Sequence, residues 1–243
     1  MAGHSKWANI QHRKNRQDSK KGKLWTKLIR EITIAAREGG KDINNNSKLR
    51  IACEKANNVN MPKDNIQRAI KRGIDNTQMD YIEARYEGYG ISGSAIIVDT
   101  MTDNKIRTTS EVRSIFNKYQ GHLGQEGSVS FLFNYCGQIV FSPNIIENAD
   151  IENKIIDIAL FHDAEDIIVD DDGFIEIICA PKKYSELHLD FKNLGLKTEI
   201  ECLTMKPINE IRLNDNDLIK FKEMIENLQA LDDIKEVYSN VIF

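Results

Sequence analysis

The spacing of apolar residues changes near residue 80, and this change limits the folds that the chain can adopt. Before it, apolar side chains recur three and four positions apart, which is typical of one buried face of a helix. After it, short runs rich in β-branched residues alternate with helical stretches, as in sheets covered by helices. We therefore expect an all-helical module followed by mixed α and β structure.

Three short helices are predicted in the first zone. The first covers residues 24–37 and ends at a Gly-Gly pair. An asparagine-rich turn at residues 44–47 can N-cap the second helix. Pro62 suits the first turn of the third helix, which Gly73 closes. Because helices this short bury little surface singly, a small bundle with a shared core is the expected arrangement.

Strands and helices alternate in the second zone. Strands are predicted at residues 95–101, 127–133, 138–141, 167–169, 174–179, 198–205 and 234–238, and helices at residues 107–119, 151–161, 183–194 and 215–231. Read in order, residues 137–204 form a β-α-β-β-α-β series, which is typical of a ferredoxin-like domain.

The predicted fold class is therefore α+β and multidomain. An N-terminal helical bundle is followed by two ferredoxin-like α/β domains, the third domain being inserted in the second. The predicted boundaries are residues 1–77 for the bundle, 78–135 plus 205–243 for the discontinuous domain, and 136–204 for the inserted domain. One continuous α+β domain after the bundle is the alternative.

Charge divides the chain at nearly the same point as the spacing of apolar residues. The formal net charge is −4, from 33 Lys+Arg and 37 Asp+Glu. Residues 1–75 carry 18 basic and 7 acidic side chains, a net of +11, whereas residues 76–243 carry 15 and 30, a net of −15. A basic module joined to an acidic remainder favours a polyanionic partner for the module. The acidic remainder, which phosphates repel, points to a protein partner.

Other features limit the location and the class of protein. No run approaches the ~18 consecutive apolar residues of a membrane span, and the first residues lack the apolar region of a secretory signal. The four cysteines are isolated, with no CxxC pair and no histidine at zinc spacing. We expect a cytoplasmic protein with reduced, mostly buried thiols and no membrane partner.

Two motifs resemble small-ligand sites, but the residues around them do not fit such sites. Residues 88–93 match G-x-G-x-x-G, but a strand rather than a helix follows, so a turn between two strands is the better interpretation. Residues 170–173 read Asp-Asp-Asp-Gly, but a calcium loop in that register would need ligands from Ile168 and Cys179. A hairpin turn is expected there. Because no nucleophile motif or paired histidine is present either, we expect no enzyme, cofactor or metal.

Basic side chains of the first helix gather on one face. At 100° per residue, Lys20, Lys23, Lys27, Arg30 and Arg37 share one arc, away from the apolar residues. This stripe is roughly 26 Å long at 1.5 Å per residue, enough for several phosphates. A solvated lysine-rich face is the alternative, but residues 1–30 hold nine basic side chains and only one acid.

The predicted nucleic-acid-binding set extends the stripe to the N-terminal arm and the third helix. It comprises Lys6, Trp7, Arg13, Lys14, Arg16, Lys20, Lys21, Lys23, Lys27, Arg30, Arg37, Arg68, Lys71 and Arg72. The cations would contact phosphates, and Trp7 would either stack on a base or plug the bundle.

Several blocks of sequence resemble one known family along the whole chain. They are AGHSKWAN (2–9) with the following IQHRKNRQDSKKGKLWTKLIREI, NMPKDNIQRAIKRG (60–73), RYEGYG (85–90), TDNKIRT (102–108), EVRSIFNKYQGHLGQEGSVSFLF (111–133) and LDDIKEVYSN (231–240). They resemble the YebC/PmpR family, whose eukaryotic relatives include a mitochondrial translational activator. The resemblance implies a helical bundle followed by two α/β domains, with no catalytic activity and no cofactor.

Two functions are compatible with the resemblance and the charge pattern. The first is a regulator of transcription that binds double-stranded DNA through the basic bundle. The second is a translation factor that lays the same stripe on ribosomal RNA, with the acidic domains turned toward basic proteins. Phosphate chemistry is common to both, so the residues alone leave the two open.

Overall fold

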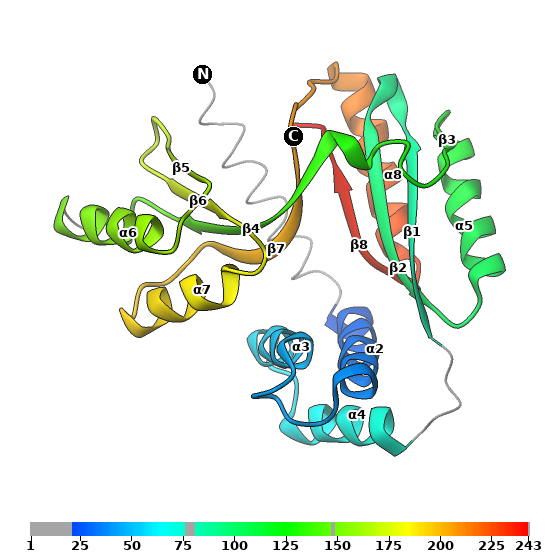
Figure 1. Ribbon diagram of the computed structural model, residues 1–243. Coiled ribbons are helices and arrows are strands. Elements are labelled where there is room, and N and C mark those ends of the chain that lie inside the picture. Colours follow the sequence, from blue (N-terminus) through cyan, green and yellow to red (C-terminus); the bar gives the residue numbers. More distant parts are fainter. Residues whose placement is uncertain (1–20, 76–80, 147–148, 243) are drawn as a thin grey trace. The chain divides into compact units, whose positions relative to one another are not determined.

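The computed structural model describes residues 21–75, 81–146 and 149–242 (Figure 1). The described residues form seven α-helices and two four-stranded sheets, which confirms the mixed α and β composition expected from the sequence. They divide into two compact units, one of residues 130–212 with 240–242, the other of residues 21–129 with 213–239. The helices of the bundle thus share a unit with the first sheet.

Three helices precede the first sheet, as expected. They are α2 (Lys21–Gly39), α3 (Ser47–Asn58) and α4 (Lys63–Asp75). The side chain of Asn46 caps α3 by accepting a hydrogen bond from the Leu49 amide, 3.0 Å away. The helices share one core, which includes Leu28, Ile32, Leu49, Ala52, Ile66 and Ile70. This closed core supports the bundle as a unit of structure.

The sequence predicts that α4 ends at Gly73, but the helix continues to Asp75. A Cβ atom at Gly73 would lie 2.2 Å from the Thr33 carbonyl oxygen of α2. Only the absence of a side chain allows the two helices to approach this closely. The Thr33 hydroxyl donates to the Ala69 carbonyl at 3.2 Å and so bridges the same crossing.

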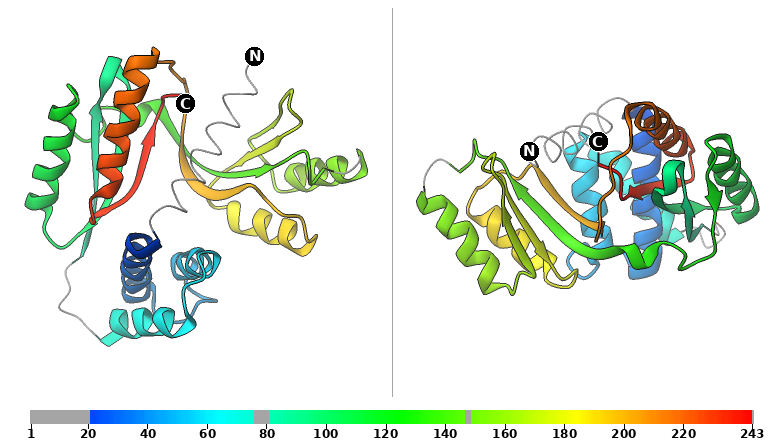
Figure 2. Two further views of the ribbon diagram at one scale, coloured as in Figure 1. Left: turned by 180° about the vertical axis from the view of Figure 1, so that it is seen from behind. Right: turned by 90° about the horizontal axis from the view of Figure 1, so that it is seen from above.

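The first sheet, sheet A, joins segments from both ends of the second zone. Its strands are β1 (Ile82–Tyr89), β2 (Ala95–Thr102), β3 (His122–Leu123) and β8 (Ile234–Ser239), in the order β3-β1-β2-β8 with every pair antiparallel. Helices α5 (Lys105–Lys118) and α8 (Asp215–Ala230) contact each other and pack on this sheet (Figure 2). Phe116 and Phe221 are buried in this packing.

β1 is the strand expected before the turn at residues 88–93, but the sequence predicts no bounds for it, because its buried positions include Glu87 and Gly88, which do not follow an apolar alternation. One strand prediction is wrong. A strand was predicted at residues 127–133, but turns and a 3-10 helix (Ser130–Leu132) precede β4 there. The amides of Gly127 and Val129 donate to the Glu87 carboxylate instead of to a neighbouring strand.

The second sheet, sheet B, lies in the other unit. Its strands are β4 (Phe133–Phe141), β5 (Asp166–Val169), β6 (Ile175–Cys179) and β7 (Ile200–Pro207), in the antiparallel order β5-β6-β4-β7. Helices α6 (Ala149–Phe161) and α7 (Tyr184–Asn193) cover one face of the sheet. Their core contains Ile139 and Ile177 from the strands and Phe191 from α7. The β-α-β-β-α-β order is the one that the sequence predicts.

Candidate nucleic-acid interface

The predicted binding residues fall into three groups in the structure. Lys6, Trp7, Arg13, Lys14, Arg16 and Lys20 lie outside the described residues. Lys21 and Lys23 belong to the first turn of α2, but their side chains are not among those described. The remaining residues lie on α2 and α4, and their surroundings differ.

Two cations of α2 contact the last turn of α8 and the short connection that leads from it to β8. The Lys27 ammonium donates to the Gln229 carbonyl at 2.8 Å. The Arg30 guanidinium donates to the Asp232 carbonyl at 3.1 Å and to Asp233 Oδ1 at 2.9 Å. In this conformation, both side chains bind acceptors of the chain itself.

Arg37 of α2 also binds within the same unit. Its guanidinium donates to the Tyr81 carbonyl at 2.9 Å. The Arg30 guanidinium lies over the Tyr81 ring, 5.4 Å from the centroid, which is within the range of a cation–π contact. Helical periodicity correctly places these cations on one face, and that face contacts residues that directly precede β1 and β8 of sheet A.

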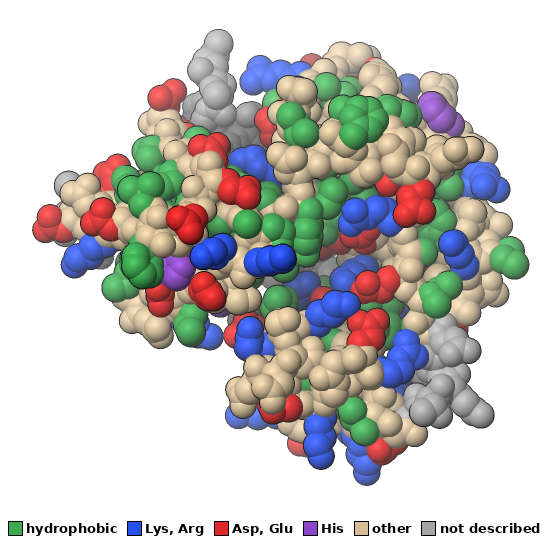
Figure 3. All heavy atoms as spheres, viewed as in Figure 1, with side chains coloured by type: hydrophobic (Ala, Val, Ile, Leu, Met, Phe, Trp, Pro, Cys, Tyr) green, Lys and Arg blue, Asp and Glu red, His purple; other side chains and the backbone are tan. Residues whose placement is uncertain are grey.

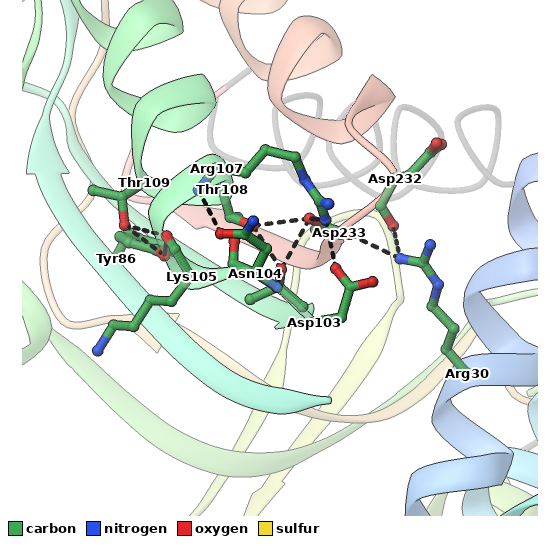
Figure 4. Close-up of polar contacts among 11 residues, drawn as sticks. Arg30, Tyr86, Asp103, Asn104, Lys105, Arg107, Thr108, Thr109, Asp232 and Asp233 are labelled. Carbon is green, nitrogen blue, oxygen red and sulfur yellow. Dashed lines mark hydrogen bonds and ion pairs between the residues drawn. The ribbon is translucent and has the colours of Figure 1, made fainter. Parts of the chain in front are cut away.

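Asp233 is the centre of this polar cluster (Figure 4). Its side chain is 4 % exposed. Oδ2 accepts hydrogen bonds from the Arg107 guanidinium at 2.6 Å, the Thr108 hydroxyl at 2.8 Å and the Thr102 hydroxyl at 3.0 Å. The Asp233 carbonyl accepts from the Met101 amide at 2.8 Å. The carboxylate is thus held by β2 and α5 independently of Arg30.

Because of these contacts, the free energy of unfolding of this unit should depend on pH in the acidic range. Burial alone would raise the pKa of the Asp233 carboxyl, but hydrogen bonds from Arg107, Thr108 and Thr102 outweigh it and lower the pKa below its usual value of 3.8. A carboxyl whose pKa is lower in the folded than in the unfolded protein stabilises the fold at any pH above its unfolded-state pKa. This contribution disappears as the pH falls through the folded-state pKa.

We therefore expect the free energy of unfolding of this unit to fall as the pH drops below about 4. The measurement is amide exchange of β2 and β8 at several pH values, with Asp233→Asn beside the wild type. The variant lacks the titrating group, so its stability should change less over the same range. Equal acid dependence in the two proteins would contradict the assignment to Asp233.

The cations of α4 differ from those of α2 because their side chains are exposed. Arg68, Lys71 and Arg72 lie on the face opposite the buried Ile66 and Ala69. Arg68 donates to the Asp64 carbonyl and to the Asn65 side chain of its own helix. In Figure 3, basic side chains spread over the region of α3 and α4 at the bottom of the view. The structure thus brings these three predicted residues together on one accessible helix face.

Lys63 is a further exposed cation of the same helix and is absent from the predicted set. It is exposed at the first position of α4, directly after Pro62. Extending the basic set to the first turn that proline begins would have included it. Lys48 and Lys55 of α3 are also exposed, but each forms a surface ion pair, with Glu38 and Glu31 respectively.

The two small-ligand motifs are turns, as predicted. Residues 88–93 comprise the end of β1 and most of the turn to the antiparallel strand β2, and they include a 3-10 helix (Ile91–Gly93). Residues 170–173 connect β5 and β6, and Asp170 Oδ1 accepts hydrogen bonds from the amides of Asp172 and Phe174. Within the described residues no group of three or more metal-ligating side chains occurs.

The cysteines are free among the described residues, and three of the four are buried. Burial raises the pKa of the Cys179 thiol to about 11, which keeps it protonated and weakly nucleophilic at neutral pH. Within the described part of the chain, no helix is both long enough and apolar enough for a membrane span.

Comparisons with known proteins cover nearly the whole chain. Residues 5–76 match the profile described as the TACO1/YebC protein N-terminal domain, and residues 81–241 match that of the TACO1/YebC second and third domain. The chain is 55 % identical over 244 residues to a "probable transcriptional regulatory protein" of Bordetella avium, covering 100 % of this chain and 98 % of the relative.

A less similar relative and a solved structure also match nearly the whole chain. A protein of the same description from Nitrosospira multiformis is 49 % identical over 243 residues, covering 100 % of this chain and 99 % of the relative. The crystal structure of a conserved hypothetical protein from Aquifex aeolicus is similar with a TM-score of 0.78 and 37 % identity. That similarity covers 92 % of this chain and 91 % of the other.

Proposed function

The chain belongs to the TACO1/YebC family, and on that basis we propose that it is a non-enzymatic, cytoplasmic regulator of gene expression that binds nucleic acid through its basic N-terminal module. The names of its relatives, which describe probable transcriptional regulatory proteins, support a regulatory role. DNA is the polyanion that these names favour.

The exposed basic face of α4 carries this proposal. Arg68, Lys71 and Arg72 are all exposed on a helix whose opposite face is anchored in the bundle core, and Lys63 is exposed at the first position of the same helix. A rigid helix that presents several cations can contact several phosphates without rearranging its backbone. The cations of residues 1–23 would extend this contact.

Ribosomal RNA is the second candidate, and the charge of the remaining chain favours it. Residues 76–243 carry a net charge of −15, which duplex DNA repels along its whole length. On a ribosome, by contrast, basic proteins lie beside the RNA and could receive an acidic domain. In-cell crosslinking with sequencing of bound DNA and bound RNA separates the candidates, because enrichment of ribosomal RNA without promoter DNA would exclude the first.

The α4 face should contribute directly to affinity and to its dependence on salt. We expect the triple change of Arg68, Lys71 and Arg72 to Ala to weaken binding about tenfold at 0.1 M salt. On duplex DNA, the slope of log K against log salt should become shallower by up to ~0.9 for each lost phosphate contact. Fluorescence anisotropy with labelled duplex DNA and with structured RNA gives both quantities.

A matched triple change controls for total charge. Lys105, Arg113 and Lys220 are exposed on α5 and α8, and their change to Ala removes the same three charges away from the bundle. This control should bind nearly as the wild type does. If both triple variants lose affinity equally, net charge rather than the α4 face determines binding.

A further inference from the structure

The acceptors that hold Lys27 and Arg30 resemble a phosphate in chemistry. They comprise two main-chain carbonyls, those of Gln229 and Asp232, and one carboxylate oxygen of Asp233, at 2.8 to 3.1 Å from the cations. Phosphate oxygens bind lysine and arginine by the same charge-assisted hydrogen bonds. The segment 229–233 thus supplies α2 with the type of contact that a nucleic acid would supply.

The two sides of this contact are held unequally. Asp233 Oδ2 is fixed by Arg107, Thr102 and Thr108, so the carboxylate keeps its place whether or not Arg30 is bound. Arg30, whose side chain is 22 % exposed, takes only Oδ1 of this group. Figure 4 shows Arg30 approaching from the opposite side to Arg107. The acidic side is therefore preformed, and the cation is the part that can leave.

We propose that segment 229–233 is an autoinhibitory contact that competes with nucleic-acid phosphates for Lys27 and Arg30 of α2. This inference rests on the proposed function, because it requires nucleic acid as the competitor. A side chain that donates to Asp233 and the adjacent carbonyl cannot offer the same N–H groups to a phosphate. Binding along α2 therefore requires that Lys27 and Arg30 first leave the segment.

The strength of the contact suits a reversible switch. An ion pair that is partly exposed is modest and is screened by salt, so a polyanion with several phosphates can displace it. Couplings between competing sites are typically about 5- to 150-fold in affinity. For one ion pair and two carbonyl contacts we expect the low end, roughly fivefold.

Asp233→Asn is the first test, in the full chain with labelled duplex DNA and structured RNA as separate probes. The change removes the charge that holds Arg30, so the variant should bind roughly fivefold more tightly than the wild type. Glu226→Gln is the control, because it removes one exposed acidic charge from neighbouring α8 without touching the contact. The control should change affinity much less.

Arg107→Gln is the second test, and its expected effect has the opposite sign. Without Arg107, Arg30 is the remaining cation bonded to Asp233 among the residues that the structure describes, so the contact strengthens and binding should weaken several-fold. Arg113→Gln removes one exposed charge from the same helix and is the matched control. This test remains decisive if Asp233→Asn fails to fold, which circular dichroism would reveal.

Opposite shifts in the two variants, each relative to its own control, support the proposal. Weaker binding in both variants would show that Asp233 only stabilises the fold, and affinities equal to those of the controls would show that no competition exists. Either result overturns the proposal while the wild type still binds. If neither the wild type nor Asp233→Asn binds either probe, the proposed function fails and the competition fails with it.

Discussion

Replacing Gly73 with alanine is expected to destabilise the helical module by about 3 kcal/mol. Alanine in place of glycine within a helix ordinarily stabilises it by up to about 1 kcal/mol. Here the added Cβ would lie 2.2 Å from the Thr33 carbonyl oxygen and 3.0 Å from the Ala36 Cβ. Because the closest atom belongs to the backbone of α2, the helices must separate to admit it.

Separation of the two helices affects more than one contact. The buried hydrogen bond from the Thr33 hydroxyl to the Ala69 carbonyl spans the same crossing and would be stretched. The core between α2 and α4, which includes Ile32, Ile66 and Ile70, would lose packing at the same time. A bundle of three short helices has little stability in reserve, so these losses should be visible at once.

Amide hydrogen exchange of α2 and α4 measures this effect without assuming that the whole chain unfolds in one step. A loss of about 3 kcal/mol corresponds to roughly 100-fold faster exchange of the protected amides. Gln67→Ala changes an exposed residue of the same helix and should be nearly neutral. Slower exchange in Gly73→Ala would contradict the close crossing.

Local sequence patterns predict the helices and strands of this fold better than they predict the contacts between them. The three helices of the bundle, and the strand order along residues 133–207, follow from hydrophobic period and turn residues. Gly73 shows the limit of that approach. Glycine near the end of an apolar stripe is typical of a helix terminus, and only the position of Thr33 forty residues earlier reveals the crossing.

The candidate site shows the same limit on a longer scale. Periodicity places Lys27, Arg30 and Arg37 on one face of α2, which is correct. Periodicity cannot indicate that Asp233, about two hundred residues later, accepts a hydrogen bond from Arg30 of that face. A cationic stripe is a local property of sequence, whereas its partner depends on how distant segments meet. The exposed face of α4 was predictable because its cations remain on the surface.

Replacing Glu87 with alanine is expected to destabilise the unit that contains sheet A by about 4 kcal/mol. Glu87 is 2 % exposed in the middle of β1. Its Oε1 accepts from the Gly127 amide at 3.0 Å, and Oε2 accepts from the Val129 amide at 2.9 Å. Each hydrogen bond from an amide to a carboxylate contributes about 1.5 to 3 kcal/mol.

Alanine would remove both acceptors and leave the space of the side chain empty. The Val129 amide is buried, so water replaces the lost hydrogen bond poorly, and an unsatisfied buried donor costs about 1 to 3 kcal/mol. Because these amides donate to Glu87, residues 127–129 form a turn instead of the strand that their apolar pattern predicts. The same carboxylate therefore determines both the conformation of this loop and much of its stability.

The contrast with Glu83 isolates this effect. Glu83 lies on the same strand, but its side chain is half-exposed and forms a surface pair with Lys235 at 3.2 Å. Its replacement by alanine should cost at most about 1 kcal/mol, as for other exposed pairs. Exchange of the Gly127 and Val129 amides should accelerate strongly in Glu87→Ala and little in Glu83→Ala. Retained protection of both amides in Glu87→Ala would show that the loop is held by its own backbone, and the apolar pattern would then need another explanation.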